Sequence, residues 1–246
     1  MKPILFSTPM VKALLNAKPG TWPAEPIDPG RPCKSQTRMV MKPQPGEGNS
    51  ITSISAEGFL TVMKYAAEIW TDTDEGESVQ LNPPYRSGDI LWVKETFQAW
   101  GYWFYYYDKE SGKERKHFMD ETDATHPHLF CGGFVESPTS GMNPNMCGYW
   151  KRSSIHMPRE VARLFLEVRE VRAERLQDMH EDDVGKEGIL IDGRLCKMPC
   201  GDCTSDDGFD LRLPFIDLWD RINGKGAWES NPWVWVYSFM RVEAEK

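Results

Sequence analysis

The sequence lacks any long hydrophobic run, since no segment approaches the roughly 18 apolar residues that a membrane-spanning helix needs. Its N-terminus carries one Lys and an apolar stretch too short for a signal peptide. Basic residues are also in deficit, with 29 Lys and Arg against 37 Asp and Glu and a net charge of −8. These absences predict a cytoplasmic protein without a membrane partner. They also argue against coating of long nucleic acid through phosphate neutralisation alone, while a nucleoside or a short single strand stays open as a partner.

Cysteines number only six in a chain with no sign of secretion, so we expect reduced thiols or metal ligands and no disulfide framework. Cys196, Cys200 and Cys203 lie close together in a Gly/Asp-rich segment. This spacing predicts a structural zinc site that needs a fourth ligand, for which Cys147 or Cys131 is available. The alternative is a set of metal-free thiols, because only one CxxC pair is present. We expect no cofactor in catalysis, since His ligands are missing nearby.

What the sequence does contain is typical of a folded domain rich in short strands. Hydrophobic residues make up 40% and aromatic residues 12% of the 246 positions, which is enough for one substantial core. Apolar patterns predict strands at 37–42, 90–93, 102–107, 113–119, 164–173 and 233–240, with helices near 8–15, 181–187 and 214–222. Between Val168 and Val171 the apolar phase slips by one residue, which predicts a β-bulge. Strands interleaved with short helices indicate an α+β or mainly β fold built on a small closed β-barrel.

The segment from Lys34 to Arg38 gathers a cation, two hydroxyls, an amide and a guanidinium within five residues. On composition alone it is equally compatible with a polar loop at the start of a strand. Its significance depends on the rest of the chain. Further distinctive stretches follow it in order, at residues 85–96, 154–159, 176–178, 187–189, 218–219 and 231–235, and residues 1–7 precede it.

By the order and number of these stretches the sequence resembles the ASCH family, a branch of the PUA-like barrels, and in particular its larger bacteriophage and prophage members. The resemblance implies a single PUA-like β-barrel domain over residues 1–246, with short flanking helices and long loop insertions at about 43–84, 98–148 and 190–212. It also implies a cleft for RNA or a modified nucleoside. No single motif is decisive.

The resemblance further implies a chemistry. Small bacterial relatives are amidohydrolases that remove the acetyl group from N4-acetylcytidine, using residues that fall here on Lys34, Thr37 and Glu187. Other relatives are ribonucleases or RNA-binding modules, so the family does not fix the reaction. The Pro-rich loop before Lys34 departs from the compact relatives.

These three residue types suit amide hydrolysis on chemical grounds. Thr37 can act as the nucleophile or orient a water, and a desolvated Lys34 can act as its base. Glu187 falls at the expected C-terminal end of a helix, where the helix dipole disfavours negative charge, and this suits an acid/base role. The alternative for Glu187 is an exposed side chain offset by Lys186. The acidic run 181–183 is expected to be the solvated first turn of the same helix.

Other polar and aromatic residues are candidates for lining the cleft. The candidate ligand-binding residues are Arg38, Lys94, Glu95, His156 and Arg159, and the candidate stacking surfaces are Trp92, Trp103 and Trp150. Structural roles are open for each: Trp92 as core, Lys94 and Glu95 as pairs across or beyond the strand end, and His156 as a hydrogen-bonding residue.

The sequence therefore predicts a nucleobase- or RNA-handling protein of a bacterium or a phage-infected cell, acting as a hydrolase of N4-acylated cytidine or a similar base. The alternatives are a non-catalytic reader of RNA or modified bases, a ribonuclease, and a phage interaction protein that acts through its insertions.

Overall fold

A computed structural model of the chain describes residues 1–45, 50–54, 60–63, 78–137, 146–189, 210 and 212–243. Strands predominate there and helices are short, so the predicted class of mixed α and β structure dominated by sheets is confirmed. None of the helices in these ranges combines the length and the apolar character that crossing a bilayer requires.

The chain divides into two compact units. The first contains Met1–Lys2, Ala13–Leu91 and Leu164–Lys246, and the second contains Pro3–Lys12 and Trp92–Arg163. The single domain with three insertions stays a prediction.

The three predicted insertions lie in different parts of the chain, and the structure describes them to different extents. Residues 98–148 belong to the second unit, and nearly all of residues 190–212 lie outside the described positions. Within 43–84, where the sequence favoured neither helix nor strand, the structure has a three-stranded sheet. Its strands, in spatial order, are β3 (Ser50–Ile54), β4 (Leu60–Met63) and β5 (Ser78–Leu81).

A five-stranded sheet forms the main framework. In spatial order its strands are β1 (Lys2–Leu5), β6 (Ile90–Lys94), β10 (Phe165–Arg175), β11 (Trp233–Val242) and β2 (Gln36–Val40). β10 and β2 both pair antiparallel with β11, and the register of β10 shifts between Val168 and Glu170. The predicted β-bulge is therefore confirmed. The pairing order begins at β1 and ends at β2, and it does not show the predicted barrel closure.

The bulge decides which side chains share a face of this sheet. After it, Arg172 lies opposite Val236, and Val236 lies opposite Arg38 on its other side. Directly opposite residues project to the same face, so the two arginines flank Val236 on one face. Glu174 lies two positions beyond Arg172 and shares this face.

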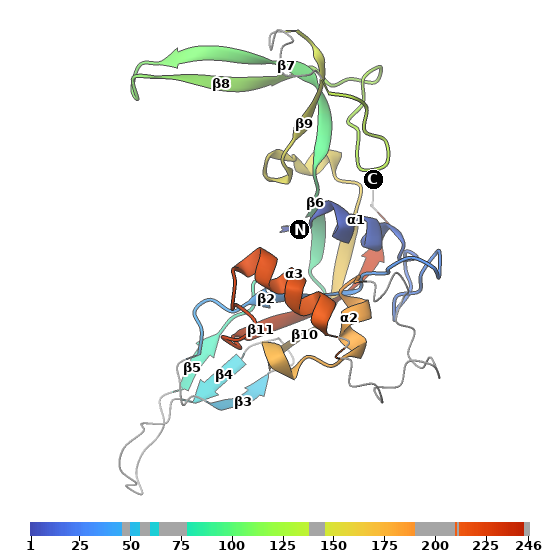
Figure 1. Ribbon diagram of the computed structural model, residues 1–246, viewed down its shortest axis with the longest axis vertical. Coiled ribbons are helices and arrows are strands. Elements are labelled where there is room, and N and C mark those ends of the chain that lie inside the picture. The colour runs from blue at the N-terminus through green and yellow to red at the C-terminus, as the bar shows by residue number, and fades with distance from the viewer. Residues whose placement is uncertain are drawn as a thin grey trace, which may run out of the picture. The chain divides into compact units, whose positions relative to one another are not determined.

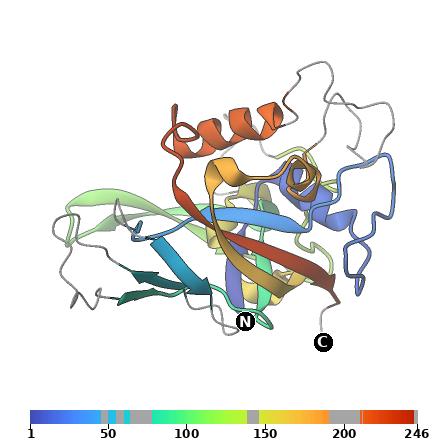
Figure 2. The same cartoon turned by 90° about the horizontal axis from the view of Figure 1, so that it is seen from below.

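Short helices cover that face (Figure 2). They are η3 (Leu176–Asp178), α2 (Asp182–Lys186) and α3 (Leu213–Asn223). Phe215 and Trp219 of α3 pack with Val184 of α2 against Val236 in one hydrophobic cluster. The helix predicted near 214–222 is α3, and it ends at Gly224, whose φ of 106° is a conformation that only glycine adopts readily. The expected N-terminal helix is α1 (Thr8–Leu15).

In the second unit, β7 (Phe97–Asp108) is the centre of a three-stranded sheet between β8 (Lys113–Asp120) and β9 (Gly148–Arg152). Its first part, Phe97–Gly101, pairs with β9, and from Gly101 onwards it pairs with β8 (Figure 1). The strands predicted at 102–107 and 113–119 are confirmed, and they form an antiparallel hairpin. Two 3-10 helices, η1 (Ser154–His156) and η2 (Arg159–Val161), follow β9.

Candidate functional site

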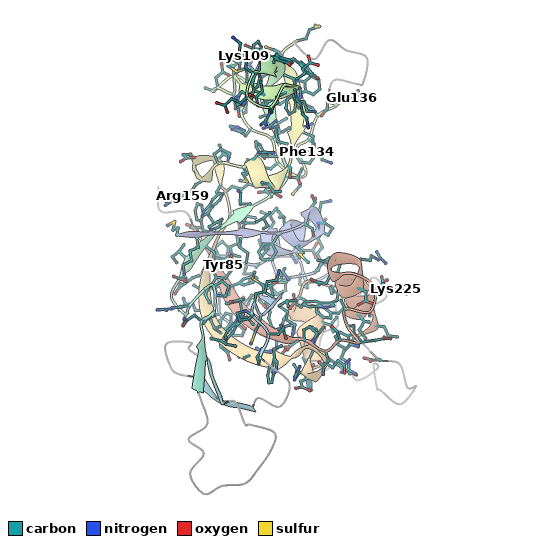
Figure 3. All side chains as sticks on the ribbon, turned by 90° about the vertical axis from the view of Figure 1, so that its left-hand side faces the viewer. Tyr85, Lys109, Phe134, Glu136, Arg159 and Lys225 are labelled. Atoms are coloured by element: carbon teal, nitrogen blue, oxygen red, sulfur yellow. The ribbon has the colours of Figure 1, made fainter. Side chains whose placement is uncertain are left out.

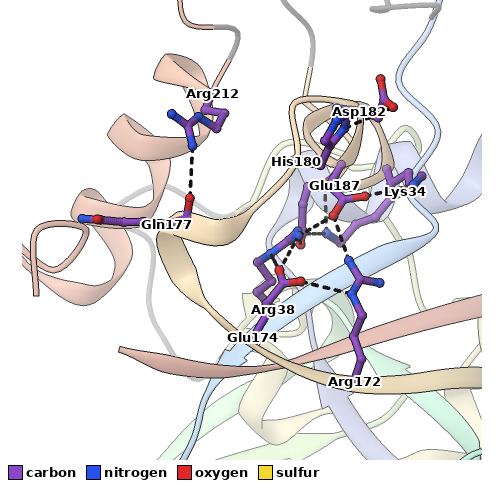
Figure 4. Close-up of polar contacts among 11 residues, drawn as sticks. Lys34, Arg38, Arg172, Glu174, Gln177, His180, Asp182, Glu187 and Arg212 are labelled. Carbon is purple, nitrogen blue, oxygen red and sulfur yellow. Dashed lines mark hydrogen bonds and ion pairs between the residues drawn. The ribbon is translucent and has the colours of Figure 1, made fainter. Parts of the chain in front are cut away.

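Lys34 and Glu187 form a direct ion pair in the first unit (Figure 4). The Lys34 Nζ donates to Glu187 Oε2 at 2.8 Å and to the Glu187 backbone oxygen at 2.9 Å, and both side chains are buried. Two backbone hydrogen bonds hold the segment before β2 in place: Lys34 N donates to Ala13 O, and Ser35 N donates to Lys186 O. The chain thus fixes Lys34 beside the C-terminal end of α2.

Arg38 extends this pair into a larger set of charges. Its Nε donates to Glu174 Oε1 at 2.9 Å, one terminal nitrogen donates to Asp183 Oδ2 at 2.6 Å, and the other donates to Glu187 Oε1 at 3.0 Å. The guanidinium is fully buried and its central carbon lies 5.8 Å from the centre of the Phe215 ring. One arginine therefore holds three carboxylates from β10, α2 and the end of α2.

Two half-exposed cations complete the set. Arg172 donates to Glu174 at 3.1 Å and to Asp183 at 2.8 Å, and Lys186 donates to Asp183 at 2.9 Å. We call these seven residues the charge network: Lys34, Arg38, Arg172, Glu174, Asp183, Lys186 and Glu187. It contains four formal positive charges and three negative ones, so it is one positive charge in excess.

Burial and partners shift the proton affinities in the charge network. Burial lowers the pKa of Lys34, although the neighbouring Glu187 carboxylate opposes this. Burial disfavours the charge of Arg38, but Glu187, Glu174 and Asp183 outweigh it and raise the pKa of Arg38. Burial likewise opposes ionisation of Asp183, and Lys186 and Arg38 nevertheless bring its pKa down to about 2. Burial therefore makes Lys34 easier to deprotonate than a lysine in water.

Two sequence expectations about α2 are wrong. Asp183 was expected in a solvated first turn, yet only 4% of it is exposed, because the first turn of α2 faces Arg38 and Arg172. Glu187 was given an exposed position as an alternative, and it is buried against Lys34. Charged residues alternate along β10, and this pattern in the sequence indicates that one face of the strand is charged. Strand periodicity alone does not show that helices cover that face.

Thr37, the third predicted catalytic residue, is separated from this pair. It lies on β2 next to Arg38, and side chains alternate along a strand, so it projects to the opposite face of the sheet. On that face its directly opposite partner is the buried Tyr237. The structure thus brings Lys34, Arg38 and Glu187 together and leaves Thr37 outside their hydrogen bonds.

The remaining candidate ligand-binding residues lie in the second unit. Both Lys94 and Glu95 form pairs beyond the end of β6: Lys94 Nζ donates to Ile155 O at 2.6 Å, and Arg163 binds both carboxylate oxygens of the buried Glu95 at 2.8 and 2.9 Å. His156 and Arg159 are exposed on η1 and η2.

The candidate stacking residues of this unit are engaged within it. Trp92 is buried, as the core alternative predicted. Lys116 and Arg152 both lie over the Trp103 ring. Trp150 donates its indole N–H to Gly101 O at 3.0 Å.

The structure describes only some of the predicted zinc ligands. Cys196, Cys200 and Cys203 lie outside the described residues, and Cys147 is exposed. Cys131 Sγ lies 3.4 Å from an Arg163 nitrogen, and burial together with nearby carboxylate charge raises its pKa, which disfavours the thiolate that zinc needs. No group of three His, Cys, Asp or Glu residues suited to a metal occurs in the part of the chain that the structure describes. The zinc site stays a prediction.

Comparison of the chain with protein-family models, with curated proteins and with solved structures found no match. The function therefore has to be argued from the charge network itself. Its central pair places a lysine of lowered pKa 2.8 Å from a carboxylate, an arrangement that can pass a proton between two side chains.

Proposed function

We propose that the chain is an ASCH-type protein with a PUA-like barrel that handles a nucleobase in the cytoplasm of a bacterium or a phage-infected cell. The activity that we propose is hydrolysis of the acyl group from N4-acylated cytidine or a similar modified base. One observation carries the proposal: Lys34 and Glu187, two of the residues that the family resemblance pairs, are in direct contact although 153 positions separate them.

In this reaction a water attacks the acyl carbon, the C–N bond to N4 breaks, and the water proton ends on the leaving amine. Lys34 in its neutral form takes the proton from the attacking water, and burial, which lowers the pKa of Lys34, favours that form. Glu187, in contact with Lys34, carries the proton to the leaving nitrogen. Arg38 fixes the Glu187 carboxylate through Oε1 and leaves Oε2 to the lysine. Thr37 faces the other side of β2 and has no step in this scheme.

A non-catalytic reader of RNA or modified bases is the second candidate. The observation that favours it is the saturation of the pair, since Glu187 already accepts hydrogen bonds from both Lys34 and Arg38. A reader needs these groups only as a rigid frame, whereas a hydrolase has to free one of them for the substrate.

The test is incubation with a panel of N4-acylated cytidines and cytosines, read by mass spectrometry. Wild type is compared with Lys34→Ala, Glu187→Gln and, as a matched control, Lys186→Ala, which removes a half-exposed cation that contacts Asp183 alone among the carboxylates of the network. The hydrolase predicts turnover that Lys34→Ala and Glu187→Gln abolish and Lys186→Ala keeps. Absence of turnover on every member of the panel, with wild type still binding them, would favour the reader.

A further inference from the structure

The outer part of the β7–β8 hairpin is a two-stranded ribbon whose two faces differ. Beyond Gly101, β7 pairs with β8 and no longer with β9 (Figure 1). Because side chains alternate and opposite residues share a face, the register defines each side. One side, which we call the basic aromatic face, carries two cations against one carboxylate, and its residues are Tyr102, Phe104, Tyr106, Asp108, Lys113, Arg115, His117 and Met119.

Two exposed, nearly parallel rings on this face form what we call the platform. Phe104 and Tyr106 are 52% and 42% exposed, which is unusual for large aromatic side chains. Their ring centres are 6.4 Å apart and their planes differ by only 10°. Two neighbouring, nearly parallel rings that face solvent offer adjacent stacking positions for flat ligands.

The outer part of the hairpin does not share the acidic character of the chain. Residues 102–119 contain the basic residues Lys109, Lys113, Arg115 and Lys116 and the acidic residues Asp108, Glu110 and Glu114. Four positive against three negative charges give +1, within a chain whose net charge is −8. Arg115 pairs with Asp108 at 2.8 Å at the end of the face and keeps more than half of its side chain exposed. The face is thus complementary to a short anionic strand rather than to a long duplex.

We propose that the basic aromatic face binds single-stranded nucleic acid, with successive bases stacked on Phe104 and Tyr106 and the backbone phosphates near Arg115 and Lys113. Aromatic rings combined with cations hold single strands in this way without reading their sequence, because every base has a π-face. The binding is independent of the Lys34–Glu187 pair, so it stands or fails separately from the hydrolase.

The other face of the same ribbon supplies a matched control. Tyr105 and Tyr107 project there and are 44% and 66% exposed, so they are as accessible as the proposed platform. Their face carries Glu114, and its cation Lys116 is engaged over Trp103 at 4.7 Å. It therefore has comparable aromatic area and no excess of positive charge, since it carries one cation and one carboxylate.

The experiment is fluorescence anisotropy with labelled oligouridine and oligothymidine of about ten nucleotides, a length in the range that single-strand binding surfaces cover. The Phe104→Ser/Tyr106→Ser double variant is expected to bind about tenfold or more weakly, since each lost base–aromatic stack accounts for a factor of that order. The Tyr105→Ser/Tyr107→Ser double variant is expected to bind like wild type. Arg115→Gln is expected to reduce the slope of log K against log salt concentration by about one, which is the change expected when one phosphate contact is lost. Preference between the two oligomers decides whether RNA or DNA is the ligand.

Three results would overturn the proposal: absence of binding by wild type, equal losses in both double variants, or a salt dependence that Arg115→Gln leaves unchanged.

Sedimentation of the same proteins tests the alternative that this face contacts another protein chain. If Phe104→Ser/Tyr106→Ser separates a dimer and leaves oligonucleotide binding intact, the face contacts a second copy of the chain and not nucleic acid. Figure 3 labels Lys109 in the turn of this hairpin, where a fluorophore on a substituted residue would report binding locally.

Discussion

A Cβ atom on Gly188 would lie 2.9 Å from the Cβ atom of Lys34. Gly188 follows Glu187 directly and has φ +79°, a left-handed conformation that glycine adopts without strain. The end of α2 and the segment before β2 can therefore approach closely enough for the Lys34 Nζ to reach both oxygens of Glu187 that it contacts. The ion pair therefore depends on the lack of a side chain at Gly188 as well as on the two charges.

Gly188→Ala is expected to destabilise the protein by roughly 2–4 kcal/mol, combining left-handed strain with the close contact to Lys34 and Ala13. Gly20→Ala is the control, because Gly20 has a similar φ of +75° and open space where the Cβ would lie. Urea unfolding measures both. Equal losses in the two variants would mean that the approach of Lys34 tolerates a methyl group.

Arg38→Met is expected to destabilise the protein far more than Lys34→Met. Loss of Arg38 leaves three carboxylates facing fewer cations, and breaking a buried pair in this way costs about 3–5 kcal/mol. Lys34 pairs with one carboxylate only, Glu187, which Arg38 still holds after the substitution, so a smaller loss of roughly 1–3 kcal/mol is expected. Guanidinium denaturation of both variants tests the order, and a reversed order would mean that the number of carboxylates a cation contacts does not set the cost of losing it.

Acid is expected to weaken the first unit through Asp183. The pKa of Asp183 is about 2 in the folded chain and about 3.9 in an unfolded one, so the folded state binds fewer protons between these values. The contribution, about 2 kcal/mol, is fully present above pH 4 and is lost as the pH falls towards 2. Urea unfolding from pH 5 to pH 2 should show this decline in wild type and a flatter profile in Asp183→Asn. Parallel profiles would exclude Asp183 as the titrating group.

Gly101→Ala is expected to separate β8 from β7. A Cβ on Gly101 would lie 2.0 Å from the backbone oxygen of Met119, which cannot move without breaking the ladder. Amide hydrogen exchange should show lost protection along β8. Gly133→Ala is the control within the same unit, because its Cβ would lie 3.8 Å from the nearest atom. Unchanged protection in Gly101→Ala would mean that the strands accommodate the methyl group by shifting together.

Local patterns in the sequence predicted the elements that depend on local chemistry. The slip of the apolar phase after Val168 indicated the bulge, and the apolar pattern at 214–222 indicated α3. The patterns at 102–107 and 113–119 indicated the strands β7 and β8. In each case the determining residues lie within a few positions of one another, so a short stretch of the sequence is enough to predict the element.

The charge network was only partly predictable because its members meet through tertiary packing. Lys34 and Glu187 were found through a family resemblance, whereas Asp183 was assigned to solvent and Thr37 to the same site as Lys34. Helix periodicity places Asp183 on a turn, but only the packing of α2 on the sheet decides what that turn faces. Similarly, the alternation along β2 separates Thr37 from Arg38 once the strand begins at Gln36.

The separation of Lys34 from Glu187 also sets an order of events during synthesis. A ribosome delivers Lys34 and Arg38 long before Glu174, Asp183 and Glu187, the carboxylates that neutralise them. Until residue 187 has emerged, these cations have no reason to leave water, and β2 cannot complete its buried face. The first unit therefore closes around these charges only late in synthesis, once β11, the strand that pairs with β2, has also been made, and a nascent chain arrested before that point would present a basic segment to the cell.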